Sequence, residues 1–141
     1  MDSNLTPGQL IRRLAYAFLG LLAGDAILLV YLVCMALRDP VAPLLHPVFV
    51  FYAFFSFMGW IIIGLPVVLL FSARSIKRLS WPLKVLVGAG LGPIGLLPIM
   101  WWLNHAQFDF NILRATAIYA PFSIVISTVS FVVYAALLHR E

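Results

Sequence analysis

Apolar residues fall in four long runs along the chain, separated by short segments that carry most of the charged residues. The runs cover approximately residues 14–37, 47–71, 82–103 and 112–138. A helix needs about 20 mostly apolar residues to cross a bilayer, so each run is long enough for one crossing. Short connections favour antiparallel packing of neighbouring helices. We therefore predict an all-α integral membrane protein, in which four transmembrane helices form one up-down antiparallel bundle over residues 1–141.

The composition supports a membrane protein. The chain has 141 residues, of which 64% are hydrophobic and 10% are charged, and its mean hydropathy is +1.07. Soluble domains average about 45–50% apolar and about 25% charged residues. These values exclude an ordinary soluble domain, a disordered chain and a nucleic-acid-binding module. The single cysteine, Cys34, excludes an internal disulfide and a cysteine zinc cluster.

The first helix has a recognisable start. Thr6 and Gln9 have the spacing of a capping box, and Pro7 suits the first helical position. The apolar run that follows is long, and no small-residue cleavage site comes after it. We therefore interpret this segment as a retained membrane anchor rather than a cleaved signal peptide.

Lysine and arginine are unevenly divided between the two ends of the predicted bundle. Only Arg38 and Arg114 fall at one end. The other end carries Arg12, Arg13, Arg74, Lys77, Arg78, Lys84 and Arg140. Because short cytoplasmic loops carry the excess of positive charge, we predict that both termini are cytoplasmic, in a membrane of the bacterial inner-membrane type. The cluster of Arg74, Lys77, Arg78 and Lys84 is either a topology signal alone or also a contact for anionic lipid headgroups.

Asp25 lies near the centre of the first run and is the only acidic residue inside any of the four. A charged aspartate at this depth costs roughly 2.5–3.5 kcal/mol on insertion scales, so such a residue is a functional candidate by default. It could carry a proton, bind a cation or hold a partner helix. The alternative is a neutral carboxyl group that donates to a serine hydroxyl or to its own helix. The polar or irregular positions predicted at the same depth are Ser56, Gly92, Pro93, Ser123 and Ser127.

Small and hydroxylated residues form a stripe along one face of the fourth run. The stripe contains Thr116, Ala120, Ser123, Ser127, Ser130 and Tyr134. Such residues let membrane helices approach closely, and Gly20 and Gly24 give the first run a similar seam. Helix packing explains both features, and a polar pathway lining is the alternative. If the glycine seam packs on the stripe, Asp25 points elsewhere, toward the second or third helix or another protein chain.

Proline interrupts the third run near its middle. Pro93 has no backbone N–H and its ring should bend the helix, so we predict a third helix kinked at Gly92–Pro93. A plain kink with close packing is one interpretation. The other is a discontinuous helix whose free carbonyl groups coordinate an ion.

Residues with the spacing of an enzyme site are missing from the sequence. An outer metal site would need His46, His105, Asp39 and Asp109, but these residue types lack a defensible spacing. No base stands beside Cys34 or the serines of the fourth run, as nucleophilic catalysis would need. We therefore expect no enzyme activity, no metal and no cofactor.

The layout of four short spans with one acid in the first, in the context Leu22-Ala23-Gly24-Asp25-Ala26, is similar to that of the small multidrug-resistance transporters. That family uses a membrane-embedded glutamate in its first span to exchange protons for lipophilic cations. The present chain has an aspartate instead and longer spans. The resemblance is one of layout, and it implies a proton-binding or cation-binding role for Asp25.

Two functional hypotheses follow. The leading one is a non-enzymatic, small multi-span inner-membrane protein that works as a homo-oligomer or as an accessory subunit of a membrane complex. Its partners would be membrane lipids, further copies of itself or other membrane subunits, and no nucleic acid. The alternative is a small proton- or cation-coupled transporter or pore that uses Asp25 at the bilayer midplane.

Overall fold

The computed structural model describes residues 6–38, 45–103 and 110–140, and these residues form helices without any strand. The elements are α1 (Pro7–Ala36), α2 (Leu45–Gly59), the π-helical turn η2 (Trp60–Gly64), α3 (Leu65–Leu70), α4 (Ala73–Arg78), α5 (Trp81–Leu103) and α6 (Phe110–His139).

Within the described ranges, four helices are long and apolar enough to cross a membrane. They cover Pro7–Met35, Tyr52–Leu70, Trp81–Trp102 and Tyr119–His139. The all-helical class and the four candidate spans are therefore confirmed. The up-down order, the cytoplasmic termini and the single-domain boundaries stay predictions.

The start of α1 has the predicted capping box. The Gln9 backbone N–H donates to the Thr6 hydroxyl over 3.4 Å, and the Thr6 backbone N–H donates to the Gln9 side-chain oxygen over 3.2 Å. Each bond satisfies a donor that the first helical turn would otherwise leave unpaired, so the helix starts where the sequence predicts.

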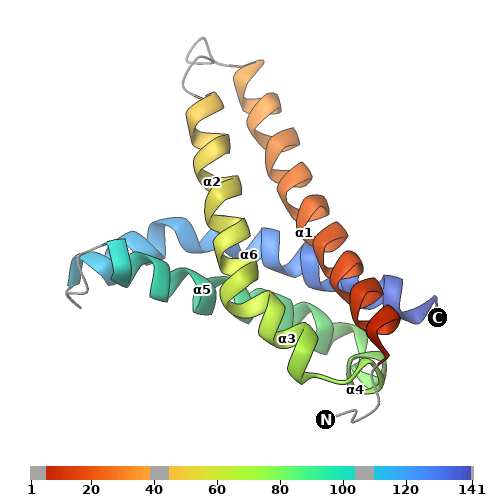
Figure 1. The fold of residues 1–141 in the computed structure, drawn as a ribbon. Coiled ribbons are helices and arrows are strands. Elements are labelled where there is room, and N and C mark those ends of the chain that lie inside the picture. Colours follow the sequence, from red (N-terminus) through yellow and green to blue (C-terminus); the bar gives the residue numbers. More distant parts are fainter. Residues whose placement is uncertain (1–5, 39–44, 104–109, 141) are drawn as a thin grey trace.

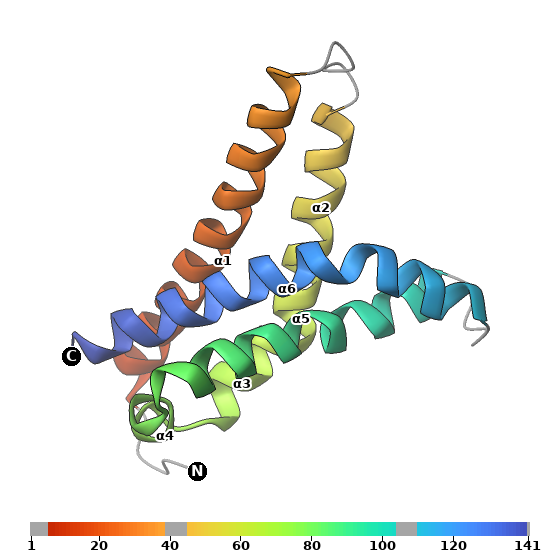
Figure 2. The same cartoon turned by 180° about the vertical axis from the view of Figure 1, so that it is seen from behind.

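The helices form two hairpins that diverge from a shared end (Figure 1). One hairpin consists of α1 with α2 and α3, and the other consists of α5 and α6. The shared end contains α4, the N-terminal end of α1 and the C-terminal end of α6. We call it the α4 end. Seen from behind, α6 crosses α1 (Figure 2). The hairpins therefore meet at an angle instead of standing as four parallel columns.

Helix α6 is central because glycines of two neighbours pack directly on its backbone. A Cβ atom on Gly24 of α1 would lie 2.6 Å from the Ile126 carbonyl oxygen, and one on Gly88 of α5 would lie 2.8 Å from the Thr128 Cα. Gly20 and Gly92 approach α6 equally closely, at Ser130 and Ser123. The predicted glycine seam of the first span therefore lies on the small-residue stripe of the fourth. The side chain of Thr116, also assigned to that stripe, lies outside the described residues.

Short helix α4 closes the shared end of the two hairpins. Ser72 caps it, because the Ser72 hydroxyl accepts from the Ser75 backbone N–H over 3.1 Å. Ile76 is buried in a cluster with Val68 and Leu138, while Arg74 and Arg78 are exposed. Burial of one apolar face fixes α4 against the ends of the spans and leaves its basic residues outside.

Irregular backbone lies in the second span, where sequence reasoning did not place it. The turn Trp60–Gly64 is π-helical, and the Leu65 N–H bonds the Trp60 carbonyl. Pro66 follows directly, and a proline ring crowds the carbonyl four residues earlier, which a wider turn accommodates. Helix α5, by contrast, passes Pro93 and Pro98 as one helix from Trp81 to Leu103. The kink at Gly92–Pro93 stays a prediction.

Candidate intramembrane cavity

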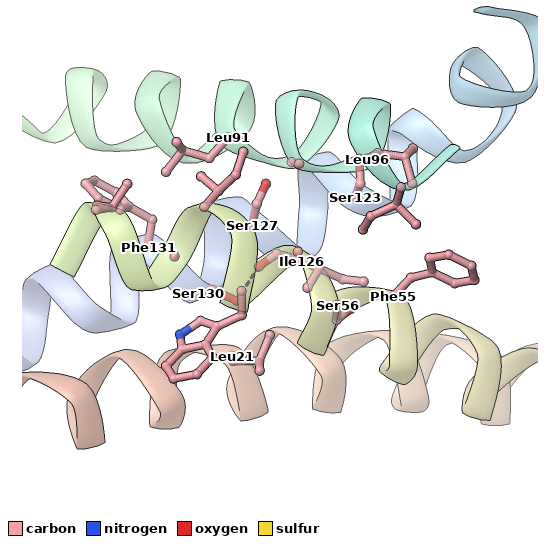
Figure 3. A pocket seen from close by; sticks show the side chains of 18 of the residues that line it. Leu21, Phe55, Ser56, Leu91, Leu96, Ser123, Ile126, Ser127, Ser130 and Phe131 are labelled. Atoms are coloured by element: carbon pink, nitrogen blue, oxygen red, sulfur yellow. Dashed lines mark hydrogen bonds between the residues drawn. The ribbon is translucent and has the colours of Figure 1, made fainter. Parts of the chain in front are cut away.

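A cavity of about 140 Å³ lies between the two hairpins, with walls from all four spans. Figure 3 shows Leu21 of α1, Phe55 and Ser56 of α2, Leu91 and Leu96 of α5, and Ser123, Ile126, Ser127, Ser130 and Phe131 of α6 around it. The divergence of the hairpins opens the space that these side chains line. The walls are mainly apolar, and their serine hydroxyl groups come from α6 and from Ser56 of α2.

The hydroxyl groups of the α6 serines in the wall donate hydrogen bonds to backbone carbonyl groups. Ser123 donates to Ala120 over 3.0 Å, and Ser130 donates to Ile126 over 2.7 Å. Ser127 donates to Gly88 of α5 over 2.6 Å and is 3.2 Å from the Ile124 carbonyl oxygen. A hydroxyl has one proton and two lone pairs, so these serines retain only acceptor capacity toward the cavity. These three hydroxyl groups favour a cation or a hydrogen-bond donor over an anion.

Asp25 is not in the cavity wall, but its hydrogen-bond partner Ser56 is. Ser56 belongs to α2, so the aspartate meets the second helix, one of the alternatives that the glycine seam predicts. The other carboxyl oxygen, Oδ1, is buried and has no hydrogen-bond partner in the described part of the chain. The carboxyl group therefore lies behind the cavity wall and is connected to it by a single hydrogen bond to Ser56. Its Oδ1 atom could still accept a further hydrogen bond.

Aromatic side chains supply much of the remaining wall, and sequence reasoning did not assign them to a site. The indole of Trp60 lies between Phe18, edge-on at 5.9 Å, and Phe57, stacked at 6.2 Å. Gly64 leaves room for it, since a Cβ atom there would stand 2.7 Å from the Trp60 Cδ1. The Trp60 Nε1 is buried, and no residue within the described ranges accepts a hydrogen bond from it. Trp60 and Gly64 are one helical turn apart in the sequence, and this spacing could have indicated that the glycine makes room for the indole.

The other predicted site residues divide between the cavity and the helix contacts. Gly92, Ser123, Ser127 and Ser130 line the cavity together with Ser56. Gly20 and Gly24 lie instead at the α1–α6 contact. Pro93 is outside the wall.

A metal site has no support in the described part of the chain. No group of three or more possible ligand side chains gathers there. The described residues do not include all of the candidates for an outer metal site. Outside them lie Asp39, His105, Asp109 and the side chain of His46.

The four basic residues proposed for headgroup contact are not equivalent. Arg74 and Arg78 are exposed and Lys77 is half-buried. Lys84 is only 8% exposed, and its ammonium group donates to the His139 Nε2 over 2.8 Å. From the start of α5, its ammonium group thus bonds the last turn of α6. Lys84 therefore does not share the exposed basic surface of α4.

Comparisons of the chain with protein-family models, curated proteins and solved structures gave no match.

Proposed function

We propose that this protein is a small membrane transporter that binds a lipophilic cation in the cavity between its hairpins and exchanges it for a proton at Asp25. The observation that carries the proposal is the placement of Asp25 one hydrogen bond behind a wall that offers acceptors. Aromatic faces strengthen the case, because Tyr52, Trp60 and Tyr119 also line the cavity. Such faces attract organic cations that have lost their water.

Coupling follows from charge balance at the carboxyl group. A cation in the cavity stabilises the carboxylate of Asp25 relative to the carboxylic acid, so binding releases a proton. By reciprocity, protonation of Asp25 weakens cation binding by the same factor. Ser56 links the two groups, because it bonds the carboxyl group of Asp25 and also lines the cavity.

The test is equilibrium binding of benzyltrimethylammonium to the purified protein in mild detergent. Its uncharged isostere, neopentylbenzene, is the matched control ligand. We expect wild type to prefer the cation and Asp25→Asn to lose that preference, by about tenfold or more, because the charge–charge attraction acts through a dry, weakly screening site. Equal binding of the two compounds by wild type, or an unchanged preference in Asp25→Asn, would contradict the proposal.

Assembly as a homo-oligomer or an accessory subunit is the second candidate function, and the second span favours it. Only 6% of its most apolar window is buried within the chain, against 28–33% for the other three. Phe54 is 57% exposed on this span. The test is native mass spectrometry after gentle extraction, with Phe54→Ser beside wild type. A defined oligomer or complex that Phe54→Ser weakens would support assembly, and a strict monomer would contradict it.

A further inference from the structure

Arg13, near the start of α1, is a buried cation whose hydrogen bonding is incomplete. Its side chain is 3% exposed. The Nη2 group donates to the carbonyl oxygen of Phe71, the residue that ends α3. Nε and Nη1 are also buried, and neither has a hydrogen-bond partner among the described residues.

A guanidinium group stays charged in proteins, so burial does not remove its need for a partner. A buried charge is costly unless it is paired and hydrogen-bonded. The Phe71 carbonyl supplies one bond and the negative end of a helix dipole, but it carries no full charge. Asp25, the acid on the same helix, lies about 18 Å further along at a rise of 1.5 Å per residue. The balancing anion is therefore not provided by that residue.

The surroundings of Arg13 add positive charge. Helix α4, which follows Phe71 after a single residue, exposes Arg74 and Arg78 beside half-buried Lys77. Burial of Ile76 holds α4 against the same end of the molecule. Basic residues at this level attract anions from the solution or the membrane surface. Phe71, whose carbonyl group accepts from the guanidinium, is itself 55% exposed at the α3–α4 connection.

We propose that Arg13 is the centre of a binding site for a phosphate group at the α4 end. The Phe71 carbonyl fixes one arm of the guanidinium, and phosphate oxygens accept from the nitrogens that now lack partners. Planar guanidinium suits this contact because it offers several N–H donors in a fixed arrangement. The exposed arginines of α4 draw the anion in, and the connection at Phe71 and Ser72 shifts to admit it. The phosphate comes either from a lipid headgroup or from a free phosphate compound.

The experiment measures the melting temperature, Tm, of the full chain in three settings. These are neutral detergent with added inorganic phosphate, nanodiscs of phosphatidylcholine, and nanodiscs containing phosphatidylglycerol. Arg13→Gln is the test variant, and Arg12→Gln, at the exposed neighbouring arginine, is the matched control. A ligand that binds only the folded state raises Tm.

We expect phosphate-bearing anions to raise the Tm of wild type and of Arg12→Gln but not of Arg13→Gln. A response to inorganic phosphate identifies a site open to free phosphate compounds. A response confined to phosphatidylglycerol identifies a lipid headgroup site. Absence of any response in wild type, or an equal response in Arg13→Gln, would overturn the proposal.

Should Arg13→Gln fail to fold, Arg13→Lys replaces it. This variant keeps the charge but loses the planar fork, so we expect phosphate binding weaker by about tenfold, from the loss of charged hydrogen bonds. Binding as tight as in wild type would overturn a guanidinium-centred site.

Discussion

Gly24 on α1 and Ile126 on α6 lie so close together that a Cβ atom on the glycine would stand 2.6 Å from the isoleucine carbonyl oxygen. This contact joins the two hairpins, because α1 belongs to one and α6 to the other. The divergence of the hairpins, and therefore the cavity between them, depends on this close approach.

Gly24→Ala should destabilise the fold, because the added methyl group meets backbone that cannot give way. Overpacking of this kind costs about 1–3 kcal/mol. The matched control is Gly90→Ala in α5, where a Cβ atom would have nothing within 4 Å. Thermal unfolding in detergent measures both. Equal Tm values for the two variants would show that the α1–α6 contact is looser than described.

Ser127→Ala should weaken the contact between α5 and α6. The Ser127 hydroxyl donates to the Gly88 carbonyl of the facing helix, whereas the Ser130 hydroxyl donates within its own helix. Hydrogen bonds between membrane helices contribute about 0.6 kcal/mol on average. Unfolding measurements should therefore give a larger loss for Ser127→Ala than for Ser130→Ala. The reverse order would contradict the assigned bond.

His139→Leu should destabilise the α4 end by leaving the buried Lys84 ammonium without its acceptor. An unsatisfied buried group costs about 1–3 kcal/mol, and more when it is charged. The double variant Lys84→Met, His139→Leu should recover much of that loss, because it removes both polar partners. Exposed Arg140→Ala serves as the control. Additive losses in the double variant would mean that the two side chains do not interact.

Trp60 should report on ligands in the cavity through its fluorescence. It lines the cavity, while Trp81, Trp101 and Trp102 are exposed and absent from the wall. Benzyltrimethylammonium should therefore change the emission of wild type, and Trp60→Phe should lose most of that change. Trp102→Phe is the control and should keep it. An unaltered response in Trp60→Phe would place the ligand elsewhere.

The sequence predicted features that depend on local pattern. Four apolar runs predicted four candidate spans, and Thr6 and Gln9 predicted a capping box. Gly20 and Gly24 predicted a seam for close helix packing, and the serine stripe was one surface that this seam could meet. Each of these signals is carried by residues of a single run or of the segment that starts it.

Features that depend on how the hairpins meet could not be read in this way. Lys84 and His139 are far apart in the chain, so their hydrogen bond follows only from the pairing of α5 with α6. The cavity needs the angle between hairpins, which no single run encodes. The π-helical turn before Pro66 had a local signal in proline and Gly64, but the same signal at Gly92–Pro93 accompanies a continuous helix.

Proton release on cation binding tests the central claim most directly. Wild-type protein in weakly buffered detergent solution is titrated with benzyltrimethylammonium while the pH is recorded. The account predicts release of protons that saturates with binding, and no release from Asp25→Asn or on addition of neopentylbenzene. Cation binding without proton release, or the same release from Asp25→Asn, would contradict proton exchange at Asp25.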